Sequence, residues 1–61
     1  MILLVTTPTG EAKIIFDEDG YAESAAGSAD VAWIASWKVN IDGALEFCRE
    51  KDWKTELVTC A

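Results

Sequence analysis

Two short runs of apolar and β-branched residues open the chain, and a turn sequence follows each run. Residues 2–7 (ILLVTT) lead into Pro8 and Gly10, which favour a tight turn because proline presets one backbone angle and glycine supplies a permissive position. Residues 12–16 (AKIIF) form the second run, and the acidic turn composition of residues 17–20 (DEDG) closes it. The pattern predicts a β-hairpin over residues 1–20.

The middle of the chain is less regular. Residues 21–26 predict a third short strand and residues 27–30 a loop. In residues 31–39, a period of two would place one apolar and aromatic set on one face of a strand, with Ile34 as the exception. That set consists of Val31, Trp33, Ala35, Trp37 and Val39.

A helix is the alternative for residues 31–39. Ser28 or Asp30 would then cap its N-terminus, and Trp33 would stack over Trp37 one helical turn later. The long alternation and the many β-branched and aromatic residues favour the strand.

A regular helix is predicted next, with Asn40 or Asp42 as its cap. Its apolar residues recur at helical spacing on one face: Ile41, Ala44, Leu45 and Cys48. The sequence WKTELVTC of residues 53–60 predicts a final strand. The whole chain, residues 1–61, therefore predicts one small α+β domain of order ββ(β)βαβ. In it, an antiparallel sheet made of the hairpin and two or three further strands packs against one helix.

The side chains needed for catalysis or metal binding are scarce. The chain has no histidine, and we interpret Cys48 and Cys60 as reduced thiols near the core. A calcium loop in the acidic turn is not expected, because Ile15 and Ala26 occupy two of the positions where ligands are needed. We therefore expect a protein without enzymatic activity, without cofactors and without a metal site.

Charge is distributed unevenly along the chain, whose formal net charge is −6. Residues 31–61 carry five acidic residues against four basic ones. Residues 1–30 carry Lys13 against six acidic residues: Glu11, Asp17, Glu18, Asp19, Glu23 and Asp30. Such a field repels nucleic acid and anionic membranes and attracts basic surfaces. No leader or membrane span is recognisable, so a cytoplasmic location is expected.

In its overall profile the chain resembles the small acidic inhibitors of phages and mobile elements, of the anti-CRISPR and anti-restriction type. The resemblance rests on short length, the lack of enzymatic residues and the six acidic residues just named. It implies an inhibitor that binds the nucleic-acid groove of a larger protein or ribonucleoprotein through a DNA-mimicking surface, in the host cytoplasm if phage-encoded. Asp17 and Asp19, if extended, would stand about 6.6 Å apart, which is similar to the spacing of phosphates along a strand. Glu11, Glu23 and Asp30 would continue this row if the strands are adjacent.

The alternative function is a hydrophobic interaction or assembly module. A place in the core is the simpler interpretation of Trp33, Trp37 and Trp53. If Trp33 and Trp37 are exposed instead, they would present a binding surface to a partner or to a second copy of the chain. An uncovered edge strand would offer a further route to a homodimer.

Overall fold

A computed structural model of the chain describes residues 1–59, so Cys60 and the end of the predicted final strand lie outside the described residues. Four strands form one antiparallel sheet: β1 (Ile2–Thr7), β2 (Gly10–Phe16), β3 (Ala22–Gly27) and β4 (Lys54–Val58). A 3-10 turn (Ala29–Val31) leads into the short helix α1 (Ala32–Ser36), and α2 (Ile41–Glu50) follows. The α+β class, the hairpin, the third strand and the long helix are thus confirmed.

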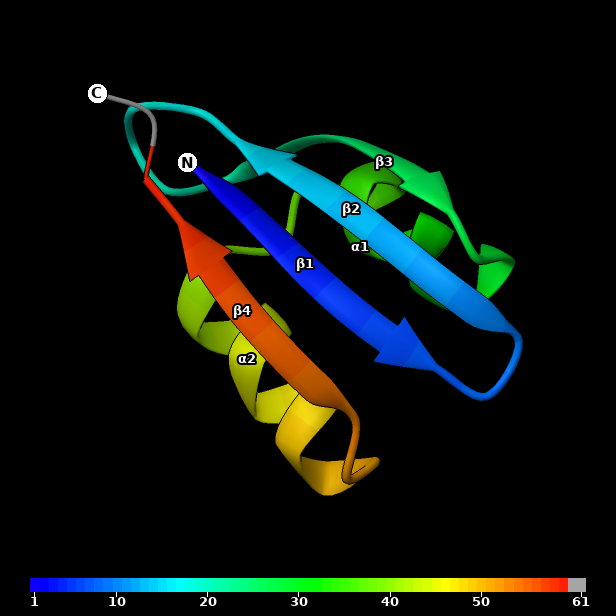
Figure 1. Ribbon diagram of the computed structural model, residues 1–61. Coiled ribbons are helices and arrows are strands. Elements are labelled where there is room, and N and C mark those ends of the chain that lie inside the picture. Colours follow the sequence, from blue (N-terminus) through cyan, green and yellow to red (C-terminus); the bar gives the residue numbers. More distant parts are fainter. Residues whose placement is uncertain (60–61) are drawn as a thin grey trace.

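The strands lie in the order β3-β2-β1-β4, and both helices lie on the same side of the sheet (Figure 1). The hairpin places β2 beside β1, whereas the chain crosses the back of the sheet through α1 and α2 before β4 pairs with the free edge of β1. One face of the sheet is therefore covered by helices and the other is not.

The preferred strand over residues 31–39 is wrong. The helical alternative is correct for Ala32–Ser36, but Trp33 packs against Phe47 rather than over Trp37. Ser28 caps the 3-10 turn, because its hydroxyl accepts a hydrogen bond from the amide of Asp30 at 3.2 Å. Val31 and Ile34 are both fully buried, three residues apart on one helical face. Ile34, the exception to the two-residue alternation, is thus the residue that reveals the helical period.

Both helices end in the same way, with a non-glycine residue in the left-handed conformation. After α1, Lys38 has φ of 50°, and the amide of Val39 donates to the carbonyl of Ile34 at 3.0 Å. After α2, Asp52 has φ of 60°, and the amide of Trp53 donates to the carbonyl of Cys48 at 2.9 Å. These are Schellman endings, which satisfy the last helical carbonyls and turn the chain sharply. Of the two predicted caps, Asn40 begins α2, since its side chain accepts from the amide of Gly43 at 2.8 Å.

The core lies between the sheet and the helices. Every second residue of β1 and β2 faces inward, and these side chains meet the buried residues of both helices. The largest fully buried side chains are Leu3, Val5, Ile14, Val31, Ile34 and Cys48. Cys48 is a free, buried thiol, and burial raises its pKa because the thiolate would lose its hydration. The interpretation of Cys48 as a core residue is confirmed.

One end of the sheet is held by close contact and hydroxyl groups. Gly27 has φ of 94°, and a Cβ atom there would lie 2.3 Å from the carbonyl oxygen of Glu11. The hydroxyl of Thr7 lies 2.8 Å from the carbonyl oxygen of Gly10 and 3.0 Å from the hydroxyl of Ser28. These contacts join the β1–β2 turn to the end of β3.

Candidate contact surfaces

The acidic turn between β2 and β3 is a folded turn, which corrects the expectation of an extended segment. One carboxylate oxygen of Asp17 accepts hydrogen bonds from the amides of Asp19 and Tyr21, both at 2.9 Å. The amide of Gly20, which has φ of 88°, donates to the carbonyl of Asp17 at 3.1 Å. The strand spacing of Asp17 and Asp19 therefore does not apply, because an aspartate that binds its own turn bends the chain.

Four of the six acidic residues lie together at this end of the sheet. A shallow hollow beside the turn is lined by Met1, Phe16, Asp17, Glu18, Asp19, Glu23 and Thr59. The side chains of Glu18, Asp19 and Glu23 are exposed, so their charges remain available to a partner.

The other two predicted acidic residues lie elsewhere, so the six do not form one row. Asp30 accepts a hydrogen bond from the hydroxyl of Thr9 at 2.7 Å, at the β1–β2 turn and the opposite end of β2. Glu11 pairs across the sheet with Thr6 on the uncovered face. Because β2 is seven residues long, its two ends lie about 20 Å apart.

The tryptophans differ from one another in burial, and a core position is wrong for Trp37. Trp37 is 79 % exposed and Trp33 is 37 % exposed, both on or just after α1. The ring of Trp33 lies 4.8 Å from that of Phe47, which in turn lies 5.5 Å from that of Trp53. Both pairs are edge-to-face, a favourable aromatic geometry. Trp33 and Trp53 thus support α2, whereas Trp37 projects free.

Backbone hydrogen bonds tie the segment after Trp37 to the acidic turn. The amide of Ala22 donates to the carbonyl of Val39 at 2.9 Å, and the amide of Ile41 donates to the carbonyl of Gly20 at 2.8 Å. Tyr21, which is 49 % exposed, forms an isolated bridge with Asn40. The exposed ring of Tyr21 and the segment that follows Trp37 therefore lie beside the acidic turn. Tyr21 has no signal of its own in the sequence, because only the fold brings it next to residues 39–41.

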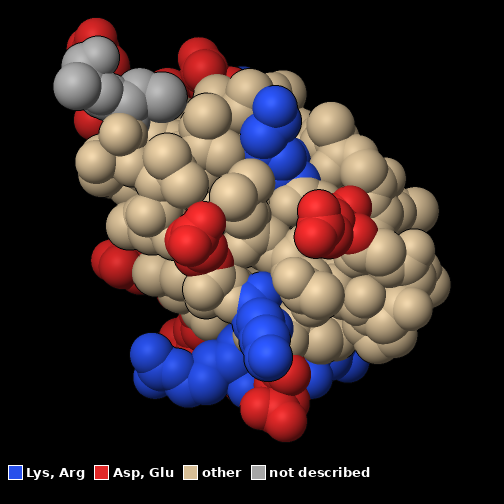
Figure 2. All heavy atoms as spheres, in the orientation of Figure 1, with Lys and Arg blue, Asp and Glu red and all other residues tan. Residues whose placement is uncertain are grey.

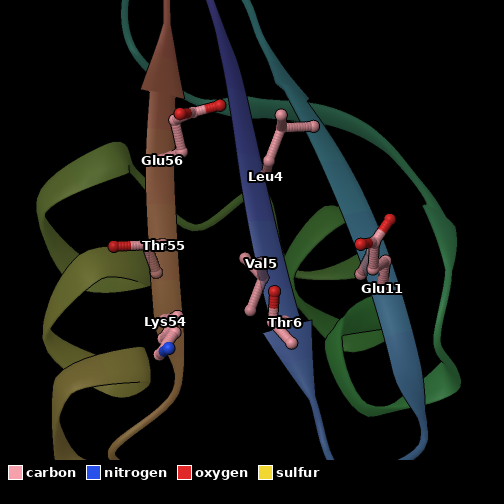
Figure 3. Close-up of a pocket in the computed structure, with 8 residues that line it drawn as sticks. Leu4, Val5, Thr6, Glu11, Lys54, Thr55 and Glu56 are labelled. Atoms are coloured by element: carbon pink, nitrogen blue, oxygen red, sulfur yellow. The ribbon is translucent and has the colours of Figure 1, made fainter.

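The uncovered face of the sheet is a second surface that the sequence analysis did not single out. Its residues alternate with the core residues along each strand. Charged side chains stand apart there on a mostly uncharged surface (Figure 2). Around a shallow depression, Glu11, Lys54 and Glu56 surround Leu4 and Thr6 (Figure 3). At the edge of the sheet, β4 is exposed along its whole length.

No group of three metal-ligating side chains occurs within residues 1–59. In the same part of the chain, neither helix has the length and apolar character needed to cross a membrane. No protein-family model, curated protein or solved structure matches this chain.

Proposed function

We propose that this chain is a non-catalytic binding module that docks onto a larger protein by inserting Trp37 into an apolar pocket of that protein. The observation that carries the proposal is the 79 % exposure of Trp37. An aromatic side chain of this kind buries roughly 150–250 Å² in an interface, among the largest gains that one residue can bring. Because the ring stays in water, it contributes little to the stability of the fold.

The position of Trp37 supports this role. It is the C-terminal cap residue of α1, and the left-handed Lys38 turns the chain away directly after it. The Schellman bonds fix the backbone on both sides of the ring. A side chain on such a rigid base loses little further freedom on binding, which favours affinity.

The charge of the same end indicates a basic surface around the partner's pocket. Glu18, Asp19 and Glu23 are exposed near Tyr21, and the whole chain carries a net charge of −6. Opposite charges at the rim of an interface mainly speed association and select the partner. The proposal places the chain in the cytoplasm, where a thiol such as Cys48 stays reduced.

A more specific candidate is an inhibitor that occupies a nucleic-acid groove, as the resemblance to phage inhibitors implies. The gathering of four acidic residues around one hollow favours it. The compact acidic end would replace a few phosphates, because Glu11 and Asp30 lie too far away to continue a row.

The test is capture from a lysate of the source organism, followed by titration of the purified captured protein. Three immobilised forms are compared: wild type, Trp37→Ala, and the matched control Ser36→Ala on the exposed part of α1. We expect Trp37→Ala to weaken binding at least about tenfold and Ser36→Ala to change it less than about twofold. Equal binding by wild type and Trp37→Ala would contradict the proposal.

A second pair of variants tests the charge. Glu18→Lys with Asp19→Lys reverses the acidic turn, and Glu46→Lys with Glu50→Lys makes the same change in net charge on the exposed side of α2. The first pair should weaken binding more than the second, and the difference should shrink at high salt. Competition by duplex DNA for the same site on the partner would select the inhibitor candidate, and its absence would exclude it.

A further inference from the structure

The uncovered face of the sheet has an ordered pattern of apolar and charged residues. Its members come from alternate positions of the strands, and the register places them in rows across the sheet. In the first row Ile2 pairs with Ile15 on one side and with Val58 on the other. This row is entirely apolar over three strands.

The next two rows carry charges of both signs. Leu4 of β1 lies between Lys13 of β2 and Glu56 of β4. Thr6 of β1 lies between Glu11 of β2 and Lys54 of β4. The two basic residues and the two acidic residues therefore occupy opposite corners of a rectangle around the Leu4–Thr6 segment. Rows are about 6.8 Å apart, and the two flanking strands are about 9.6 Å apart.

We infer that this face is the interface of a homodimer, in which a second copy of the chain packs face to face with its two-fold axis along β1. Rotation about that axis exchanges the β2 side with the β4 side. Each row of one copy therefore faces the same row of the second copy. Lys13 then faces Glu56 of the second copy, and Glu11 faces Lys54 of the second copy. Each of the four charges meets one of opposite sign.

The same rotation also covers the apolar positions. Ile2 faces Ile2 of the second copy, and Ile15 faces Val58 of the second copy. A two-fold axis across the strands would pair the charges equally well, but it would lay the apolar row against the polar β1–β2 turn. Burial of the apolar row thus selects the axis along β1. A face that complements itself under a two-fold rotation is what a dimer of identical chains requires.

The degree of exposure fits a surface covered by a partner. Leu4 and Val58 are each 37 % exposed, and both lie on this face. Stacked sheets lie about 10 Å apart, a distance that side chains from two such faces fill. Three strands and three rows span roughly 10 Å by 14 Å, which is small beside the standard interface of about 800 Å² per partner. We therefore expect a weak dimer.

Sedimentation equilibrium from about 20 µM to about 2 mM tests the inference, with a dimer dissociation constant expected in the range of hundreds of micromolar. The variant Glu56→Lys places two lysines opposite each other twice in the dimer. We expect it to weaken association at least about tenfold. Glu50→Lys on α2 makes the same change in net charge away from the interface and should leave association within about twofold of wild type.

The double variant Lys13→Glu with Glu56→Lys tests the direction of the axis. Around an axis along β1, the glutamate introduced on β2 would face the lysine introduced on β4 of the second copy, so association should return to within about threefold of wild type. Around an axis across the strands, the double variant would bring like charges together at every corner, and association would stay lost.

Three results would overturn the inference. They are a chain that stays monomeric up to about 2 mM, a Glu56→Lys variant no weaker than Glu50→Lys, and a double variant that is not rescued. If the chain itself is monomeric and a different protein binds its outer face, the first of these results has been obtained and the inference is overturned. Circular dichroism of each variant shows whether the fold is intact, and the rescued double variant serves as the internal control for folding.

Discussion

The two faces of the sheet are built from the same strands and differ in what covers them. Leu3 and Leu4 are neighbours in the central strand β1, yet Leu3 is fully buried and Leu4 is 37 % exposed. Leu3 meets the helix layer, whereas Leu4 lies between Lys13 and Glu56 on the open face. The difference shows that one face provides the core and the other is free for contact.

The aromatic residues also differ in whether they lie in the core or on the surface. Phe16 and Phe47 pack in or against the core between the sheet and the helices. Trp37 and Tyr21 lie outside it, and the amide of Tyr21 is hydrogen-bonded to Asp17 of the acidic turn. A domain of this size has one thin core, so residues that the core does not use remain available to partners.

The largest expected effect comes from shortening the two neighbouring leucines. Leu3→Ala should lower the free energy of unfolding by about 3 kcal/mol, because it leaves a cavity in the core. Leu4→Ala should lower it by about 1 kcal/mol or less, since Leu4 is partly in water already. Urea unfolding at about 20 µM, where the weak dimer is dissociated, measures both.

Leu3→Met is the control for these leucines. It keeps the volume of the side chain and should cost less than about 1.5 kcal/mol, so a folded protein remains even if Leu3→Ala unfolds. Equal losses for Leu3→Ala and Leu4→Ala would mean that the two faces contribute alike to the fold.

A second change tests whether β3 has to lie this close to β2. Gly27→Ala should destabilise the protein by about 2 kcal/mol or more, because the new Cβ atom would lie 2.3 Å from the carbonyl oxygen of Glu11 and φ there is 94°. Gly10→Ala is the matched control, since its φ is also positive but no atom lies within 4 Å of the new Cβ. If thermal unfolding shows the same loss of stability in both variants, backbone strain rather than the close approach causes the destabilisation.

A third pair of changes should stabilise the ends of the two helices that cover the inner face of the sheet. Lys38→Gly should raise the free energy of unfolding by about 1 kcal/mol, because glycine adopts the left-handed conformation without a steric cost. Asp52→Gly should give a smaller gain, since aspartate tolerates this conformation better than lysine. A loss of stability in Lys38→Gly, measured by urea unfolding, would contradict the Schellman ending of α1.

The smallest expected effect is a loss of folding stability at alkaline pH, caused by the buried thiol of Cys48. Burial raises the pKa of Cys48 above its ordinary value of 9.0. The folded state therefore holds the proton more tightly than the unfolded state, and its stabilising contribution is complete below pH 9 and declines as pH rises through the folded pKa. Unfolding between about pH 8 and pH 10 should show a smaller decline in Cys48→Ala than in wild type. Parallel declines would mean that the thiol is solvated.

The strands, the hairpin and α2 follow from the sequence because each has a local signal. These signals act on the backbone of adjacent residues: Pro8 and Gly20 favour turns, and Asn40 caps a helix. The structure has a turn or a helix start at each of these positions. The segment 31–39 was harder to predict, since its aromatic residues fit both periods. The buried pair Val31 and Ile34 decides for a helix only once the sheet to cover is known.

The contact surfaces were less predictable for the same reason. The acidic residues are visible in the sequence, but whether Asp30 is free depends on its bond to Thr9, which lies 21 residues earlier. The outer face depends on the pairing of β4 with β1, which brings Glu56 beside Leu4. Neither of these long-range contacts can be recognised from the local sequence.

Dilution followed by two-dimensional amide NMR tests most directly the claim that the open face makes contacts while the inner face holds the fold. We predict that the amides of Leu4, Lys13 and Glu56 shift between about 2 mM and about 20 µM, while the indole signals of Trp33, Trp37 and Trp53 stay fixed. Shifts confined to the indoles, or no shift at any residue, would contradict the account.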